Sequence, residues 1–412
     1  MLFERPTSLE PDPFAIVRRL SDRRDVVMAW SDHGRKAWIS CDASSVASAF
    51  DPEPELAVRS EPDGGGVPRW FGLLPYESRR DLERRMTDVR PPAAISRPLW
   101  RRYGAWVQVG ESVSVIGDDQ GRVDELRALL DRPPRESVPS LTLDSALESP
   151  ELHLARVRRA LVLIAQGEVY EVNLARRLGF RIEGRPWDLL SRLARRSLPP
   201  FSVALEWPEV SVVATSPELF LAQAPDGLVW TSPIKGTRPR SADPIRDAAL
   251  ARELDEDPKE IAELTMIIDV ERNDLGRLAI PGTVRLAQLP SVQSHASVHH
   301  RVATIEARLP RSVGRGELLG AMLPSGSVTG APKVRAMEVI AELEAARRGL
   351  YTGAFGFLKH DGTLELGMAI RTLTIRGSSA EYFTGGGIVA DSVPEREVEE
   401  TSWKAADYLG LT

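Results

Sequence analysis

The segment Thr231-Ser-Pro-Ile-Lys235-Gly-Thr-Arg-Pro-Arg240 gives the first indication of what this chain of 412 residues does. Only six of the 53 basic residues are lysine, and one of the six stands here beside Gly236 and Thr237. Arginine stays protonated, whereas a desolvated lysine can lose its proton and attack carbon. An ordinary surface charge is the alternative for Lys235, and the other segments of the chain decide between the two.

The composition excludes several classes of protein. Hydrophobic residues make up 42% and charged residues 27% of the chain, as in soluble globular proteins. A net charge of −6 offers no basic surface for nucleic acid. The apolar runs are too short for a membrane span, and the first residues do not resemble a signal peptide. The single cysteine, Cys41, excludes an intramolecular disulfide, so we expect a cytoplasmic protein without membrane or nucleic-acid partners.

The pattern of the chain changes near its first third. Residues 1–130 are β-rich and contain two expected hairpins, 26–30 with 36–40 and 103–109 with 112–116. Residues 131–148 carry three prolines and several serines, which is typical of a linker. We expect residues 149–412 to form the catalytic region, integrated with the first region into one globular unit.

The catalytic region alternates between helical and strand patterns. Ser149 and Pro150 form a helix start, and apolar residues then recur at helical spacing. Further helices are expected at 257–269, 331–348 and 395–409, and strands at 211–215, 227–231, 352–357, 368–375 and 380–384.

Seven segments, taken in order, identify a family. They are Glu168-Val-Tyr-Glu-Val-Asn-Leu174, Ser216-Pro-Glu-Leu219, Pro233-Ile-Lys-Gly-Thr-Arg238, Asp269-Val-Glu-Arg-Asn-Asp-Leu-Gly276, Ser327-Val-Thr-Gly-Ala-Pro-Lys333, Ala369-Ile-Arg-Thr372 and Gly385-Gly-Gly-Ile-Val-Ala-Asp-Ser392. Together they resemble the chorismate-utilising enzymes, which include component I of anthranilate synthase and of aminodeoxychorismate synthase. The resemblance implies an α+β fold like anthranilate synthase component I, with large antiparallel β-sheets packed face to face and helices outside.

Two pairs of glutamates form a candidate metal site. Glu260 and Glu263 are three residues apart on an expected helix, as are Glu397 and Glu400, so each pair shares a helix face. An isolated pair of this kind is usually a solvated acidic face. Mg²⁺ prefers carboxylate oxygens and substrate oxygens as ligands. The resemblance implies that Mg²⁺ binds here, most directly to Glu263 and Glu400, and holds the ring carboxylate of chorismate.

The resemblance also assigns an acid and a nucleophile. Glu218 matches the general acid that protonates the departing C4 hydroxyl, and burial would raise its pKa enough to keep it protonated. Lys235 matches the lysine whose amine attacks C2 of chorismate before ammonia enters at C4. Because a free lysine is almost wholly protonated at neutral pH, we expect desolvation or a neighbouring cation to lower the pKa of Lys235.

Eight further residues match positions that hold the substrate. Arg371 and Lys404 would bind carboxylates, Tyr351 and Thr329 would donate hydroxyl hydrogen bonds, and His300 would lie near the ring. Gly385, Gly386 and Gly387 would let backbone N–H groups approach an anion closely.

The lysine in Pro-Ile-Lys-Gly-Thr distinguishes between members of the family. Aminodeoxychorismate synthases resemble the present chain at this motif, whereas anthranilate synthases usually have Pro-Ile-Ala-Gly-Thr. We therefore expect an aminating synthase that converts chorismate and ammonia to 4-amino-4-deoxychorismate, a precursor of 4-aminobenzoate and folate. Ammonia would come from a separate glutamine amidotransferase subunit. The alternatives are anthranilate synthase component I and a catalytically silent chorismate-binding subunit. Glu171 departs from the pattern, since amine-adding members usually have glutamine there and water-adding members lysine.

Overall fold

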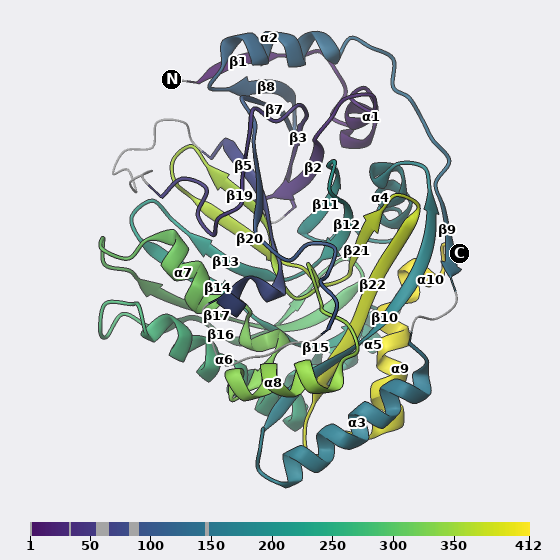
Figure 1. Cartoon of the computed structure of the whole chain (residues 1–412), viewed down its shortest axis with the longest axis vertical. Helices are drawn as coiled ribbons and strands as arrows, with labels where there is room; N and C mark the ends of the chain where they lie inside the picture. The colour runs from purple at the N-terminus through teal and green to yellow at the C-terminus, as the bar shows by residue number, and fades with distance from the viewer. Residues whose placement is uncertain (1, 33, 55–65, 82–89, 145–147) are drawn as a thin grey trace.

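Two large antiparallel β-sheets form the centre of the molecule (Figure 1). The computed structural model describes all residues except 1, 33, 55–65, 82–89 and 145–147. One sheet has twelve strands and the other ten, and every strand pair in the described residues is antiparallel.

The 12-stranded sheet combines strands from both ends of the chain. In spatial order its strands are β1 (Phe3–Pro6), β8 (Val113–Gly117), β7 (Ala105–Val109), β3 (Lys36–Ser40), β2 (Val26–Ser31), β11 (Phe201–Glu206), β12 (Ser211–Ser216), β21 (Thr372–Arg376), β22 (Ser379–Ile388), β10 (Glu171–Glu183) and β18 (Gly330–Ala331), with β9 (Ser140–Asp144) paired to β10. Both expected hairpins, β2–β3 and β7–β8, are confirmed.

The 10-stranded sheet is mixed in the same way. Its strands are β15 (Ile234–Pro239), β17 (Val298–Arg308), β14 (Leu228–Ser232), β13 (Leu219–Gln223), β20 (Leu364–Met368), β19 (Ala354–Lys359), β5 (Pro68–Leu74), β6 (Leu99–Arg102) and β4 (Ser45–Ala47), with β16 (Arg285–Ser294) paired to β17. Because β2 pairs with β11 and β5 with β19, residues before and after 148 share both sheets.

The two sheets pack face to face through an aromatic core. Alternate residues of a strand point to one face, so each sheet turns one set of apolar side chains toward the other. The ring of Trp106, in the 12-stranded sheet, lies 5.8 Å from that of Phe357 in the 10-stranded sheet. Phe71 packs edge-on against Phe357 at 5.0 Å. These rings belong to one buried cluster that also contains Val27 and Val203.

Helices cover the outer faces of the sheets, and the expected fold class is confirmed (Figure 1). They are α1 (Pro13–Arg18), α2 (Gln120–Leu129), α3 (Pro150–Ala165), α4 (Pro186–Ala194), α5 (Pro244–Glu256), α6 (Pro258–Gly276), α7 (Arg315–Met322), α8 (Lys333–Leu343), α9 (Pro394–Lys404) and α10 (Ala406–Leu409), with 3-10 turns η1 (Tyr76–Asp81) and η2 (Gly326–Val328). In the described part of the chain, no helix is both long and apolar enough to cross a bilayer.

Several expected boundaries move in the structure. The hydroxyl of Ser149 accepts a hydrogen bond from the backbone N–H of Leu152, which confirms the predicted start of α3. The helix expected at 331–348 is shorter, because Glu344 leaves the helix with an extended backbone. Within the segment expected to be a linker, β9 pairs with β10, while residues 145–147 of that segment lie outside the described residues.

The strand expected at 368–375 is divided, and the division positions a site residue. β20 belongs to the 10-stranded sheet and β21 to the 12-stranded sheet, so the chain changes sheets between them. Arg371 lies at this crossing with a φ of +49°. The chain makes a second crossing between β12 and β13, where Glu218 lies. The hydrogen bond from Thr215 N–H to the Arg371 carbonyl, at 3.1 Å, joins the two crossings.

Candidate active site

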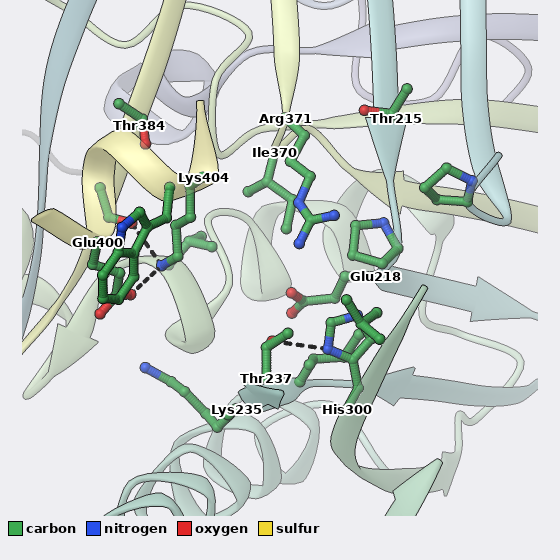
Figure 2. A pocket seen from close by; sticks show the side chains of 18 of the residues that line it. Thr215, Glu218, Lys235, Thr237, His300, Ile370, Arg371, Thr384, Glu400 and Lys404 are labelled. Atoms are coloured by element: carbon green, nitrogen blue, oxygen red, sulfur yellow. Dashed lines mark hydrogen bonds and ion pairs between the residues drawn. The ribbon is translucent and has the colours of Figure 1, made fainter. Parts of the chain in front are cut away.

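A cavity of about 660 Å³ opens between the sheet crossings and the helices α6 and α9 (Figure 2). It has the size of a small-molecule site. Eleven of the fourteen predicted site residues line this cavity: Glu218, Lys235, Glu260, Glu263, His300, Tyr351, Arg371, Gly385, Gly387, Glu400 and Lys404. Thr329, Gly386 and Glu397 are not in its lining.

A bulge in β15 places Lys235 on the cavity wall. The pairing of β15 with β17 shifts register between Lys235 and Thr237, and Gly236 between them has a φ of +81°. A Cβ at Gly236 would lie 2.9 Å from Oε2 of Glu260, so only glycine lets the carboxylate approach this closely. The Lys235 side chain is 10% exposed and points into the cavity rather than into bulk solvent (Figure 2).

The expected direction of the Lys235 pKa is wrong. Burial acts to lower this pKa, but the carboxylates of Glu171 and Glu263 outweigh burial and raise it above its ordinary value. Nζ of Lys235 donates to Oε1 of Glu171 at 2.6 Å and lies 3.7 Å from Oε2 of Glu263. The amine is therefore protonated in this state. Desolvation acts in the expected direction, but Glu171 on β10 opposes it, and this partner was not foreseen from the sequence.

Glu218 has the properties expected of a general acid. Its side chain is 5% exposed, and burial raises its pKa to about 7 although a hydrogen bond from Ser327 acts to lower it. Oγ of Ser327 donates to Oε1 of Glu218 at 2.9 Å. Figure 2 shows this carboxyl pointing into the same space as the guanidinium of Arg371. A carboxyl with this pKa can deliver a proton near neutrality.

One glutamate pair lies on α6 and the other on α9, and the two pairs face each other. Lys259 lies between them, with Nζ 3.7 Å from Glu263 and 3.7 Å from Glu397. Burial and then the neighbouring carboxylate of Glu263 raise the pKa of Glu260. As the side chains stand in the described residues, no three acidic, histidine or cysteine groups converge closely enough to hold a metal ion.

The residue types of the two glutamate pairs nevertheless match the ligands that Mg²⁺ prefers. Gly386 lies against the carboxylates, and a Cβ there would come within 3.1 Å of Oε1 of Glu400 and 3.6 Å of Oε2 of Glu397. The absence of a side chain at Gly386 thus leaves room beside the carboxylates of Glu397 and Glu400. Four carboxylates are the ligand chemistry that Mg²⁺ prefers, with Lys259 as the cation that balances part of their charge.

Arg371 provides a cation without an anionic partner. Among the described residues its guanidinium makes no hydrogen bond or ion pair, whereas its carbonyl accepts from Thr215 and from the hydroxyl of Tyr408 at 2.9 Å. The guanidinium faces the cavity (Figure 2). Its backbone is therefore fixed while its donors remain available to a planar carboxylate.

His300 presents one free ring nitrogen to the site. Burial and the charge of Arg371 lower its pKa to about 3, so the ring is neutral. Nδ1 lies 2.9 Å from Oγ1 of Thr237, and Nε2 is buried without a partner in the described residues. When Thr237 donates to Nδ1, Nε2 carries the proton and can donate to a ligand.

The remaining predicted contacts differ in how they are arranged. Lys404 donates to the Gly385 carbonyl at 2.9 Å and pairs with Glu400 at 2.6 Å. Tyr351 stacks on Phe383 with ring centroids 5.3 Å apart, and burial raises the pKa of Tyr351 to about 12. Gly385, Gly386 and Gly387 lie within β22, not in a turn.

Thr329 lies outside the lining of the cavity. Its side chain is fully buried, and its hydroxyl donates to the Ser325 carbonyl at 2.8 Å. The hydroxyl therefore stabilises the η2 turn, and the structure gives no support to the predicted contact with substrate.

Asn173 is a cavity residue that was not predicted from the sequence. It lies on β10 two residues after Glu171, so both side chains point to the same face of the strand. Oδ1 of Asn173 is buried without a partner in the described residues, and the residue lines the cavity. The alternation within the quoted segment of residues 168–174 was the signal that could have found it.

Comparison with known proteins shows the family of the chain. The family model described as chorismate binding enzyme matches residues 13–410, and the chain therefore belongs to this family of chorismate-utilising enzymes.

Two kinds of relative are similar at nearly equal identity. Aminodeoxychorismate synthase component 1 of Klebsiella aerogenes is 41% identical over 82% of this chain and 73% of its own length. Anthranilate synthase component 1 of Thermus thermophilus is 43% identical over 63% of this chain and 56% of its own length. The match with aminodeoxychorismate synthase component 1 of Salmonella typhimurium spans 54% of that relative. These identities do not separate the two activities.

Solved structures agree on the fold. The menaquinone-specific isochorismate synthase of Escherichia coli is similar with a TM-score of 0.80 at 19% identity. The match covers all of this chain and 94% of the synthase chain. Anthranilate synthase component I of Streptococcus pneumoniae has a TM-score of 0.76 at 24% identity, covering 99% of this chain and 92% of its own.

Proposed function

We propose that this protein is the chorismate-aminating component of an aminodeoxychorismate synthase, forming 4-amino-4-deoxychorismate and water from chorismate and ammonia. The observation that carries the proposal is the position of Lys235 on the cavity wall, with Glu218 lining the same cavity. An amine and a buried acid that face one cavity are what a two-step displacement needs.

The reaction runs in two displacements. The amine of Lys235 attacks C2 of chorismate while the C4 hydroxyl departs with the proton of Glu218. Ammonia then attacks C4 and expels the lysine, so the amine enters at the carbon that lost the hydroxyl. The free amine forms when the proton of Lys235 passes to Glu171, the hydrogen-bonded carboxylate whose own pKa is raised by burial.

Other residues in and beside the cavity bind the substrate and the metal ion. Arg371 and Lys404 bind the substrate carboxylates, and Nε2 of His300 donates toward the ring. Glu260, Glu263, Glu397 and Glu400 would hold Mg²⁺, which when bound would anchor the ring carboxylate and draw electron density toward it. Ammonia comes from a separate glutamine amidotransferase subunit, in the cytoplasm, and the product serves 4-aminobenzoate and folate synthesis.

One assay tests the proposal. The purified protein is incubated with chorismate, Mg²⁺ and an ammonium salt at mildly alkaline pH, and the products are separated by chromatography. 4-Amino-4-deoxychorismate as the main product supports the proposal. Anthranilate as the main product rejects it in favour of anthranilate synthase. No turnover with free ammonia favours a silent chorismate-binding subunit.

The Lys235→Ala variant tests the role of the lysine. Loss of at least about a hundredfold in rate, or a change of product, is expected if the amine is the nucleophile. An unchanged rate and product would remove Lys235 from the mechanism.

A further inference from the structure

A chain of buried hydrogen bonds connects Glu218 to a second carboxyl, Glu271 on α6. Oγ of Ser327 lies 2.9 Å from Oε1 of Glu218, and Oγ of Ser325 lies 3.0 Å from Oγ of Ser327. Oγ of Ser325 in turn lies 2.6 Å from Oε1 of Glu271. All four side chains are at most 6% exposed, so water does not compete for these contacts.

The number of protons available to these hydrogen bonds limits the total charge of the two carboxyls. Three oxygen–oxygen contacts each need one proton, but the hydroxyls of Ser325 and Ser327 supply only two. If both carboxyls were ionised, one contact would join two oxygens with no hydrogen between them. The third proton must therefore come from Glu218 or from Glu271.

Charged groups on several elements surround the two carboxyls. Burial raises the pKa of Glu271, against the ammonium of Lys333 on α8, and Asp274 on α6 raises it further. The backbone N–H of Gly326 donates to Oε1 of Glu271 at 2.8 Å. Glu218 faces Lys235 across the cavity, and the charge of Glu271 contributes to raising the Glu218 pKa.

We propose that Glu218 and Glu271 share one proton through the hydroxyls of Ser327 and Ser325, so that Glu271 acts as a positioning residue that keeps Glu218 in its acid form. This inference rests on the proposed function, in which Glu218 protonates the departing hydroxyl. Glu271 itself does not touch the substrate.

Glu218 and Glu271 lose one proton and regain one proton in each turnover. When the shared proton is on Glu271, its O–H bond breaks and this proton passes to Ser325. One proton then moves from Ser325 to Ser327 and another from Ser327 to Glu218, where an O–H bond forms. Glu218 then gives this proton to the C4 hydroxyl, which leaves as water. The pair recovers a proton from the ammonium group that ammonia forms on C4, and no electrons are transferred to or from the chain.

The pH dependence of kcat separates this role from a purely structural one. Glu271→Gln keeps an oxygen that accepts from Ser325 and Gly326 but removes the negative charge and the transferable proton. We expect the pH above which kcat falls to move downward by about one unit, because the charge that disfavours ionisation of Glu218 is gone. An unmoved profile would overturn the proposal.

Three variants complete the comparison. Ser325→Ala interrupts the chain and should also move the profile downward, whereas Ser325→Thr keeps a hydroxyl and should restore it. Glu77→Gln is the matched control, because Glu77 is another buried carboxyl that accepts two backbone N–H groups, from Arg348 and Gly349. A profile that moves equally in Glu77→Gln, or one that Ser325→Ala leaves unmoved, would contradict the shared proton. If Glu271→Gln does not fold, the Ser325 variants alone decide.

A second measurement does not require turnover. Infrared difference spectra of the protein without substrate report the pH at which buried carboxyls lose their proton. A lower midpoint in Glu271→Gln and in Ser325→Ala than in the unchanged protein is expected, and equal midpoints would overturn the proposal. If these midpoints shift but no 4-amino-4-deoxychorismate is formed, the proposed function fails while the shared proton stands.

Discussion

The ammonium nitrogen of Lys235 lies 2.6 Å from Oε1 of Glu171, and this buried ion pair joins β15 of one sheet to β10 of the other. The side chain of Glu171 is fully buried and that of Lys235 is 10% exposed, so neither charge is well solvated. Oε2 of Glu171 has no partner among the described residues. Glutamate in place of the usual glutamine thus gives Lys235 a charged partner, which raises the pKa of the lysine.

Removing Lys235 alone should destabilise the protein at neutral pH. Lys235→Ala leaves the buried Glu171 carboxylate uncompensated, and breaking a buried pair costs about 3–5 kcal/mol. Lys235→Ala/Glu171→Gln should recover much of this loss, because no buried charge remains. Urea unfolding measures the two free energies. The difference should shrink as pH falls, since Glu171, with its raised pKa, then takes up a proton. Equal stability of the two variants at neutral pH would contradict the ion pair.

Glu218 should impose an upper pH limit on the reaction. Its pKa of about 7 means that the acid form is lost as pH rises through that value. With free ammonia held constant at each pH, kcat should fall about tenfold per pH unit above the limit. Glu218→Gln should be slower by a factor of about 10² to 10⁴ and should lack this limit. A limit that persists in Glu218→Gln would assign it to another group.

Lys259 should compete with a divalent cation for the carboxylates. Its Nζ lies 3.7 Å from both Glu263 and Glu397, in the space between the two helices that carry the predicted ligands. Removing this charge in Lys259→Met should tighten Mn²⁺ binding by roughly tenfold. Electron paramagnetic resonance of free Mn²⁺ measures the affinity without turnover.

Two variants serve as controls for the cation measurement. Lys36→Met removes a lysine that is exposed at the start of β3 and should leave the affinity unchanged. Glu263→Gln should weaken binding. If Lys259→Met binds Mn²⁺ more weakly than the unchanged protein, Lys259 supports the cation site rather than competing for it.

Local patterns predicted much of the fold. The hairpins β2–β3 and β7–β8 and the start of α3 at Ser149 depend on residues close in sequence, where alternation and capping are informative. Eleven of the fourteen site residues predicted from the family resemblance line the cavity. Both kinds of evidence come directly from the residues present.

What could not be predicted depends on residues distant in sequence. The apolar run from Met368 onward resembles one strand, but hydrogen bonds from Met368 to Glu218 and from Thr215 to Arg371 direct its two halves into different sheets. The raised pKa of Lys235 likewise depends on Glu171, 64 residues away. Propensity and spacing within a segment contain neither pairing.

Arg371 should determine substrate affinity without contributing to the fold. Its guanidinium faces the cavity and, among the described residues, pairs with no acid, so truncation breaks no hydrogen bond or ion pair. A charge-assisted hydrogen bond to a carboxylate contributes about 1.5–3 kcal/mol, so Arg371→Ala should raise the KM for chorismate by about tenfold to a hundredfold. Arg371→Lys should recover only part of this, because an ammonium cannot form the two-pronged contact.

The stability of the variants is the internal check on Arg371. Thermal unfolding of Arg371→Ala should match the unchanged protein, since the backbone carbonyl that accepts from Thr215 and Tyr408 is retained. Arg376→Ala removes an arginine from the other end of β21, outside the cavity, and should leave KM unchanged. A lowered melting temperature with an unchanged KM in Arg371→Ala would show that this arginine supports the crossing of the sheets and does not bind the substrate.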